Sequence, residues 1–238
     1  MSNQTSTAAE ALTTVPVEER PAAAQRAVAA GEAGLEDVRA VAAGCRACGL
    51  WERATQTVFG EGTVPARIML VGEQPGDKED LAGAPFVGPA GRILDQALDE
   101  AGIDRASTFV TNVVKHFKWR PAAGGKRRLH EKPNKVEVGA CLPWVESELA
   151  LVKPEALVLL GSTAATALAG ASVRVTRDHG RPLESDLARI VIATIHPSAV
   201  LRSTDSASRD AAFGGLVDDL RVVSRELGLA APPVAGRG

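Results

Sequence analysis

Four short runs of apolar residues, rich in branched side chains, stand out along the chain. They cover residues 67–71, 108–111, 156–160 and 190–194. Apolar residues in these runs follow one another more than they alternate with polar ones, which is typical of strands covered on both faces, as in a parallel sheet. The pattern therefore predicts a central, mainly parallel sheet of four strands.

Segments with the helical spacing of apolar residues lie between and after these runs, at residues 93–101, 141–152 and 212–223. Asn134, with Glu137 three residues later, is the sequence of a capping box and predicts the start of the middle helix. Alternating strands and helices indicate a three-layer α/β/α sandwich. We place this domain at residues 36–226, after a weakly ordered segment at 1–35 that carries some helix and before a flexible tail at 227–238.

Composition limits the possible classes only modestly. Of 238 residues, 45% are hydrophobic, which is ample for one well-filled core, but only 3% are aromatic, so the core must consist of Ala, Val, Leu and Ile. The chain has no run of 18 apolar residues, and its N-terminus lacks the basic-then-apolar order of a secretory signal. We expect a cytoplasmic protein with no membrane segment.

An unusual segment follows each predicted strand: residues 72–77, Asn112, residues 161–162 and residues 196–198. In open parallel sheets, ligands bind beyond the carboxyl ends of the strands, so these segments are expected to share one crevice. The glycine motifs of P-loop and dinucleotide-binding folds are absent, so no nucleotide cofactor is expected. Taken alone, residues 72–77 are equally consistent with a structural turn.

Several motifs, in this order, resemble those of the uracil-DNA glycosylase superfamily, and most closely its iron-sulfur family 4 branch. They are Gly-Glu-Gln-Pro-Gly-Asp at 72–77, Gly-Ala-Pro-Phe-Val-Gly-Pro-Ala-Gly at 83–91, Thr-Asn-Val-Val-Lys at 111–115 and His-Pro-Ser at 196–198. The resemblance spans residues 40–225. It implies a monomeric DNA N-glycosylase that removes uracil during base-excision repair at the bacterial nucleoid and accepts single-stranded DNA.

The resemblance also implies how uracil is held. Phe86 would stack on the base, Asn112 would bind its Watson–Crick edge, and His196 would stabilise the departing anion. The structural alternatives are a core phenylalanine, a turn-capping asparagine and a buried histidine. Ser198 would orient its turn or contact the DNA backbone.

A basic segment, Lys-Arg-Arg-Leu-His at 126–130, resembles the hallmark insertion of the UdgX class, whose members become covalently attached to the abasic site that they create. His130 would be the nucleophile, and Glu73 is expected to assist it. Gln74 and Asp77 would place substrate or water, and Gln74 would also contact uracil. The alternatives for His130 are a plain phosphate contact and, for the whole protein, a hydrolytic glycosylase with turnover or a non-catalytic DNA-binding module.

Positive charge is concentrated around this segment, although the net charge of the chain is only -2. A run of charge is often just a solvated face, but beside the expected crevice it favours phosphate contacts. Gly124 and Gly125 would act as a hinge for the segment. The expected phosphate contacts are Lys115, Lys118, Arg120, Lys126, Arg127 and Arg128.

The three cysteines are Cys45, Cys48 and Cys141. They cannot all pair within the chain, and a cytosolic setting disfavours structural disulfides, so metal binding or burial remains. Family 4 members generally use four cysteines, but His116 stands where the third is expected. Spacing alone slightly favours zinc for this Cys3His set, whereas the resemblance implies a [4Fe-4S] cluster.

Overall fold

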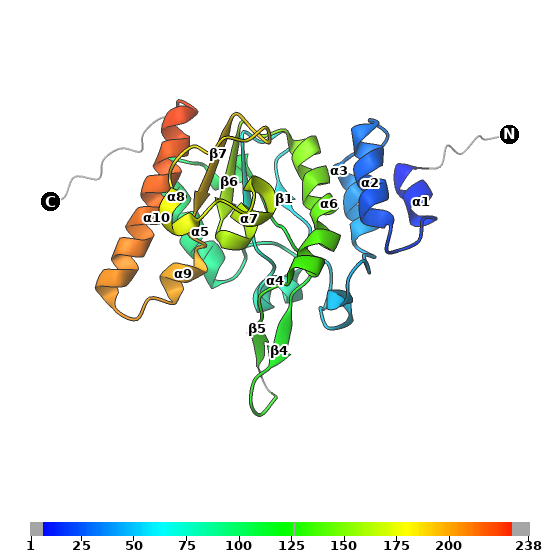
Figure 1. The fold of residues 1–238 in the computed structure, drawn as a ribbon, viewed down its shortest axis with the longest axis horizontal. Coiled ribbons are helices and arrows are strands. Elements are labelled where there is room, and N and C mark those ends of the chain that lie inside the picture. Colours follow the sequence, from blue (N-terminus) through cyan, green and yellow to red (C-terminus); the bar gives the residue numbers. More distant parts are fainter. Residues whose placement is uncertain (1–6, 126, 230–238) are drawn as a thin grey trace. The chain divides into compact units, whose positions relative to one another are not determined.

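The computed structural model describes residues 7–125 and 127–229 (Figure 1). The chain divides into two compact units. The first unit comprises the residues up to Glu61, together with Glu73–Pro85 and Thr111–Val152. The second comprises Gly62–Gly72, Phe86–Val110 and the residues from Lys153 onward. Lys126, one of the expected DNA contacts, lies outside the described residues.

A mainly parallel sheet of five strands is central to the α/β fold, in the order β1-β3-β2-β6-β7. The four predicted strands are confirmed, and parallel pairing is seen between β2 and β6 and between β6 and β7. The fifth strand, β1, has only two residues, too few for a hydrophobic pattern to reveal. The strand bounds are β1 Glu61–Gly62, β2 Ile68–Gly72, β3 Thr108–Asn112, β6 Ala156–Leu160 and β7 Ile190–Thr194.

Helices cover the sheet strands of the second unit. Alternate residues of β2, such as Ile68 and Leu70, pack in one core cluster with residues of α5 (Pro89–Glu100) and α10 (Ser206–Glu226). α7 (Ser162–Ala169) packs on β6 and β2. β3 lies on one side of β2 and β7 lies beyond β6, so the strand order reverses between β2 and β6, the kind of position where α/β sheets bind ligands.

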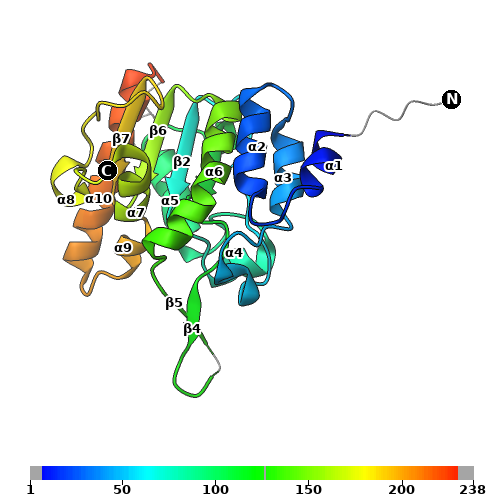
Figure 2. The ribbon, with the colours of Figure 1, turned by 45° about the vertical axis from the view of Figure 1, so that its right-hand side comes forward.

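The first unit is built on α6 (Lys135–Val152), whose start was predicted from its capping box. Asn134 N–H donates to Glu137 Oε2 at 2.7 Å, and Glu137 N–H donates to Asn134 Oδ1 at 2.9 Å, which confirms that prediction. α2 packs along α6 (Figure 2), and both α2 and α6 contact α3. The N-terminal helices are α1 Ala8–Thr13, α2 Arg20–Ala29 and α3 Leu35–Ala42.

A β-hairpin of β4 (Trp119–Pro121) and β5 (Arg128–His130) projects past α4 and α6 (Figure 1). The prediction of a loop hinged at Gly124 and Gly125 is therefore corrected. Both glycines have positive φ, 85° and 74°, and form the turn between the strands. His130 pairs with Trp119 at the base of the hairpin, not at its tip.

Shorter helices complete the described part of the chain: α4 Asp77–Ala82, α8 Val175–Asp178, α9 Ser198–Leu201, and the 3-10 turns Gly49–Glu52 and Arg105–Ser107. Asp77, expected in a turn, is thus the first residue of a helix. None of the helices in the described ranges is long and apolar enough to cross a membrane.

Candidate functional site

The structure brings His130 to Glu73 within the first unit, as the sequence analysis expected. His130 Nε2 lies 3.3 Å from Glu73 Oε1, and the His130 side chain is half exposed. Glu73 follows β2 directly, whereas His130 ends β5. A carboxylate beside an imidazole orients the ring and stabilises its positive charge, which is the arrangement that an activated histidine nucleophile needs.

Arg128 holds the hairpin against α4. Its guanidinium contacts Asp77 Oδ1 at 2.6 Å and the fully buried carboxylate of Asp80 at 2.5 Å. It also lies over the rings of Phe117 and Trp119, at 5.4 and 5.5 Å from the ring centroids. Arg128 and Asp77 therefore position the segment that carries His130, and the charge of Arg128 is balanced by carboxylates of the protein.

Gln74 fastens the base of the same hairpin. Its amide group donates to the carbonyl oxygens of Lys118 and Glu131 at 3.3 and 2.9 Å and accepts from Lys118 N–H at 3.0 Å. The side chain is buried. The Gln74 amide thus joins the residues on either side of the hairpin, Lys118 before β4 and Glu131 after β5, next to His130.

Asn112 ends β3 and is 2% exposed, yet its side-chain oxygen Oδ1 has no hydrogen-bond partner among the described residues. A buried polar atom without a partner costs roughly 1–3 kcal/mol. Such an atom is a binding position for a ligand that donates a hydrogen bond. Because a capping asparagine would have its oxygen satisfied, this finding argues against the turn-cap alternative.

Phe86, in the second unit, is held in a strained backbone conformation. Its φ is +57°, in the left-handed region that non-glycine residues rarely adopt. Gly91 makes this possible, because a Cβ there would meet Phe86 O at 1.6 Å. The Phe86 ring stacks on His196 at 6.0 Å between centroids, and it is also part of the core cluster. The core alternative and a stacking role are therefore compatible.

The contacts of His196 fix its neutral tautomer. Ser198 N–H donates to His196 Nδ1 at 3.1 Å, and Ser198 Oγ lies 2.8 Å from the same nitrogen. Since Nδ1 accepts, the proton of the neutral ring is on Nε2, which makes that nitrogen a donor. Arg202 donates to Ser198 Oγ at 2.8 Å. Ser198 therefore holds His196 within the turn at 196–198, and its contact with the DNA backbone stays a prediction.

The position directly after β6, Gly161, lies close to His196 and favours a glycine. A Cβ at this position would lie 3.0 Å from His196 Cβ, and φ is +91°. Both the close approach and the backbone angle favour glycine.

One expected phosphate contact, Lys115, is wrong, and a second, Lys118, is paired within the protein. Lys115 is fully buried, and its Nζ donates to Glu148 Oε2, Thr111 Oγ1 and Asn112 O at 2.6, 2.6 and 2.8 Å, because a buried ammonium needs partners within the protein. Lys118 pairs with Glu137 at 3.0 Å and is largely buried. Arg127, at the turn of the hairpin, is exposed.

The three cysteines lie in the first unit and influence one another. Cys45 and Cys141 are buried, and Trp144 Nε1–H donates to Cys45 Sγ at 3.3 Å. Burial, together with smaller effects of the nearby Cys45 and Cys48, raises the pKa of Cys141 to about 12. Burial also raises the pKa of Cys48. The Cys48 and Cys141 thiols therefore keep their protons unless a positively charged centre binds them.

His116 has the state expected of a metal ligand. Its Nε2 lies 3.0 Å from Thr57 Oγ1, whereas Nδ1 is buried without a partner in the described part of the chain. Burial lowers the pKa of His116 to about 4, so the ring is neutral at physiological pH. A neutral imidazole with one nitrogen held by a hydrogen bond and the other unpartnered fits a ligand position.

The described residues do not show the candidate ligands gathered around one metal ion. Across residues 7–125 and 127–229, no three His, Cys, Asp or Glu side chains are grouped to hold one metal ion. Zinc at a Zn–S distance of ≈ 2.3 Å requires sulfurs roughly 3.8 Å apart.

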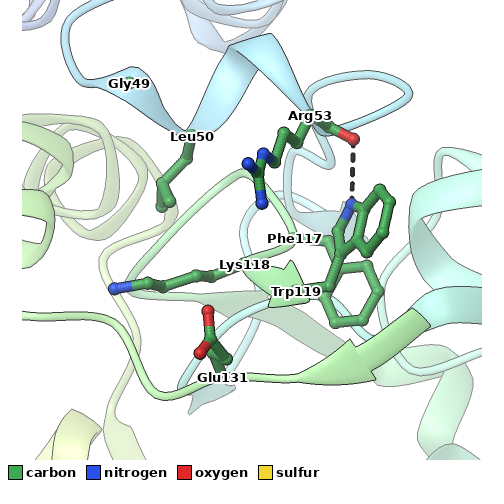
Figure 3. A pocket seen from close by; sticks show the side chains of 7 residues that line it. All are labelled: Gly49, Leu50, Arg53, Phe117, Lys118, Trp119 and Glu131. Carbon is green, nitrogen blue, oxygen red and sulfur yellow. Dashed lines mark hydrogen bonds between the residues drawn. The ribbon is translucent and has the colours of Figure 1, made fainter. Parts of the chain in front are cut away.

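The sequence analysis missed a pocket beside the hairpin (Figure 3). It has a volume of about 190 Å³ and is open to solvent. The sequence signal for this pocket was the presence of Phe117 and Trp119 close to the basic segment. Only the folded hairpin brings these two residues to the 3-10 turn after Cys48. The lining residues are Gly49, Leu50, Arg53, Phe117, Lys118, Trp119 and Glu131.

Comparison with known proteins identifies the family. The model of the uracil DNA glycosylase superfamily matches residues 59–221, a range that contains the four strand ends and the hairpin but not Cys45 and Cys48. The chain is also similar to proteins named type-4 uracil-DNA glycosylase. That of Thermotoga maritima is 37% identical over 166 residues, which cover 69% of this chain and 82% of the relative.

Two further similar proteins carry the same name, type-4 uracil-DNA glycosylase. The protein of Pyrobaculum aerophilum is 36% identical over 175 residues, covering 71% of this chain and 85% of its own length. That of Archaeoglobus fulgidus is 34% identical over 174 residues, covering 70% and 83%. The chain therefore belongs to the uracil-DNA glycosylase superfamily and, within it, to the type-4 family.

Proposed function

We propose that this protein excises uracil from DNA, including single-stranded DNA, and then bonds covalently to the abasic sugar through His130. Membership of the type-4 family supports the excision step. The observation that carries the covalent step is the contact between His130 Nε2 and Glu73 Oε1 at 3.3 Å, in a hairpin held by Gln74 and Arg128. The protein acts as a monomer and needs no nucleotide cofactor.

Three residues hold the base in this proposal. Asn112 Oδ1 accepts the imide N–H of uracil, which relieves its lack of a partner. Cytosine has no N–H at the corresponding ring nitrogen, so it is rejected. Phe86 offers its ring to the face of the base, and the Nε2–H of neutral His196 donates to a uracil carbonyl oxygen.

The covalent step then needs no water as the nucleophile. The bond between sugar C1′ and uracil N1 breaks, its electron pair leaves with uracil, and the sugar becomes an oxocarbenium-like cation. In the tautomer that donates Nε2–H to Glu73, the lone pair of His130 lies on Nδ1 and bonds to C1′. The imidazolium so formed gives its Nε2 proton to Glu73, and the uracil anion is protonated by solvent.

Cys45, Cys48, Cys141 and His116 would hold a [4Fe-4S] cluster. When bound, the cluster ties the loop of Cys45 and Cys48 to the segment after Asn112 and to α6. The neutral state of His116 and its buried, unpartnered Nδ1 support this assignment.

A denaturing gel tests the proposal. Wild-type protein mixed with labelled single-stranded DNA containing one uracil is expected to yield a conjugate that survives heating in detergent. His130→Gly is expected to yield no conjugate while still releasing some uracil. Lys132→Gly is the matched control, because Lys132 is exposed in the same segment, and its conjugate yield should equal that of the wild type.

The other outcomes select the alternatives. Free uracil without a conjugate from the wild type would mean a hydrolytic glycosylase, and no released uracil would mean a DNA-binding module. An undiminished conjugate from His130→Gly would rule out His130 as the nucleophile. The iron, sulfide and zinc contents of the same preparation distinguish a cluster from a zinc site.

A further inference from the structure

The pocket at the base of the hairpin takes no part in the chemistry proposed above. We infer that it holds the nucleotide next to the excised uridine on the same DNA strand, with the base on Trp119 and the phosphate at Arg53 (Figure 3). This inference rests on the proposed function, because it takes the strand to be the substrate DNA.

The position of the pocket is the first argument. Trp119 and His130 are directly opposite each other in the antiparallel hairpin, so their side chains share one face. Glu131, another lining residue, follows His130 in the chain. A nucleotide that adjoins a sugar held at His130 is therefore within reach of this pocket.

The charges of the lining favour a phosphate. Lys118 is paired with Glu137 at 3.0 Å, and Glu131 lies 3.8 Å from Arg120. Arg53 is exposed, and its guanidinium has no ion pair or hydrogen bond among the described residues. An exposed guanidinium left uncompensated at the edge of a pocket is suited to bind a phosphate.

The shape and walls favour a base. The volume of about 190 Å³ corresponds to roughly six waters at ~30 Å³ each, enough for a flat heterocycle. Leu50 and Trp119 supply an apolar and an aromatic wall. Aromatic platforms combined with positive charge are how proteins bind single-stranded nucleic acid without reading its sequence.

Trp119 is ordered before any ligand arrives. Its Nε1–H donates to the carbonyl oxygen of Arg53 at 2.9 Å, and the Arg128 guanidinium lies 5.5 Å from its ring centroid. A side chain already fixed loses little entropy when a base stacks on it, so the contact contributes more to affinity.

The test compares the affinities of the wild type and Trp119→Leu for DNA strands from which uracil cannot be excised, with and without a flanking base. Fluorescence anisotropy measures the affinity for single-stranded DNA with one 2′-fluorinated deoxyuridine, with either flanking base present or replaced by an abasic spacer. In the wild type, the spacer at one flanking position is expected to weaken binding about tenfold. In Trp119→Leu, strands with and without that base should bind equally.

Arg53→Ala tests the phosphate without touching the hairpin, because the backbone carbonyl that binds Trp119 remains. Affinity should fall severalfold, and the slope of log affinity against log salt should decrease by about 0.7, the value for one phosphate on a single strand. Arg26→Ala, an exposed arginine on α2 outside the pocket, should leave both unchanged.

An equal loss on spacer substitution in the wild type and Trp119→Leu, or an unchanged salt slope in Arg53→Ala, would overturn the inference. Release of uracil from ordinary uracil-containing DNA by the same wild-type preparation is scored separately. Uracil release without coupling at the pocket contradicts only this inference, whereas no uracil release contradicts the proposed function.

Discussion

The sheet strands of the second unit and the hairpin of the first are stabilised in different ways. Every residue of β2, β6 and β7 is buried, and alternate side chains of these strands join helices in one apolar cluster. No residue of β4 or β5 is fully buried. The hairpin is instead held by polar side chains from other segments, namely Gln74, Asp77 and Asp80.

The difference shows how one chain can combine a stable framework with an adjustable segment. Apolar burial is non-directional and spread over many residues, so it resists global unfolding. The hairpin depends on a few directed contacts, so it can open locally at a lower free energy. A single polar substitution should therefore release His130 while leaving the sheet intact.

The largest expected effect is on the sheet. Leu160→Ala removes a fully buried side chain from the core cluster and should lower the free energy of unfolding by about 2–5 kcal/mol, because a cavity remains. Urea unfolding measures this. Leu201→Ala, 44% exposed, is the control and should change little. A comparable loss in both variants would mean that burial does not distinguish these sites.

Asp80→Asn should act on the hairpin instead. It removes the charge that faces Arg128, and a charged hydrogen bond of this kind contributes about 1.5–3 kcal/mol. Hydrogen exchange at the Glu131 N–H, which donates to Lys118 O, should become faster by a factor of ten or more, and conjugate formation should slow.

The control for this variant is Asp178→Asn, which alters an exposed pair with Arg177 in the second unit. In Asp178→Asn, the hydrogen-exchange rate at the Glu131 N–H should be unchanged. If Asp80→Asn lowered the urea midpoint as much as Leu160→Ala does, the hairpin would have to be part of the cooperative core, contrary to the comparison.

Gln74→Ala is expected to have the smallest effect of the three. Three hydrogen bonds to backbone groups of Lys118 and Glu131 are lost, but water can replace part of them, so the net cost should be about 1 kcal/mol. Conjugate formation should slow severalfold at unchanged global stability. Gln96→Ala, which removes an exposed contact to Glu100, should leave the rate at the wild-type value.

The strands and the main helices could be predicted because their signals are local. A run such as residues 156–160 is apolar throughout, and the Asn134 and Glu137 pair lies three residues apart. The contact of Glu73 with His130 was also expected, although only from a family resemblance that links two distant motifs.

The hairpin and the buried pair of Lys115 and Glu148 could not be predicted in the same way. Arg128–His130 has only three residues, too few for an alternation of polar and apolar residues to mark it as a strand. Lys115 stands in a basic stretch of sequence, and only folding shows that its ammonium is enclosed beside a carboxylate 33 residues away.

By itself, the sequence determined the order of strands and helices and the residue types at the strand ends, because hydrophobic periodicity and capping act between near neighbours. Only the tertiary structure decided which charges are used inside the protein and which are exposed. It paired Arg128 with Asp77 and Asp80 and left Arg53 at the pocket. The physical reason is that charge pairing depends on distances in space, which residues far apart in the chain acquire only on folding.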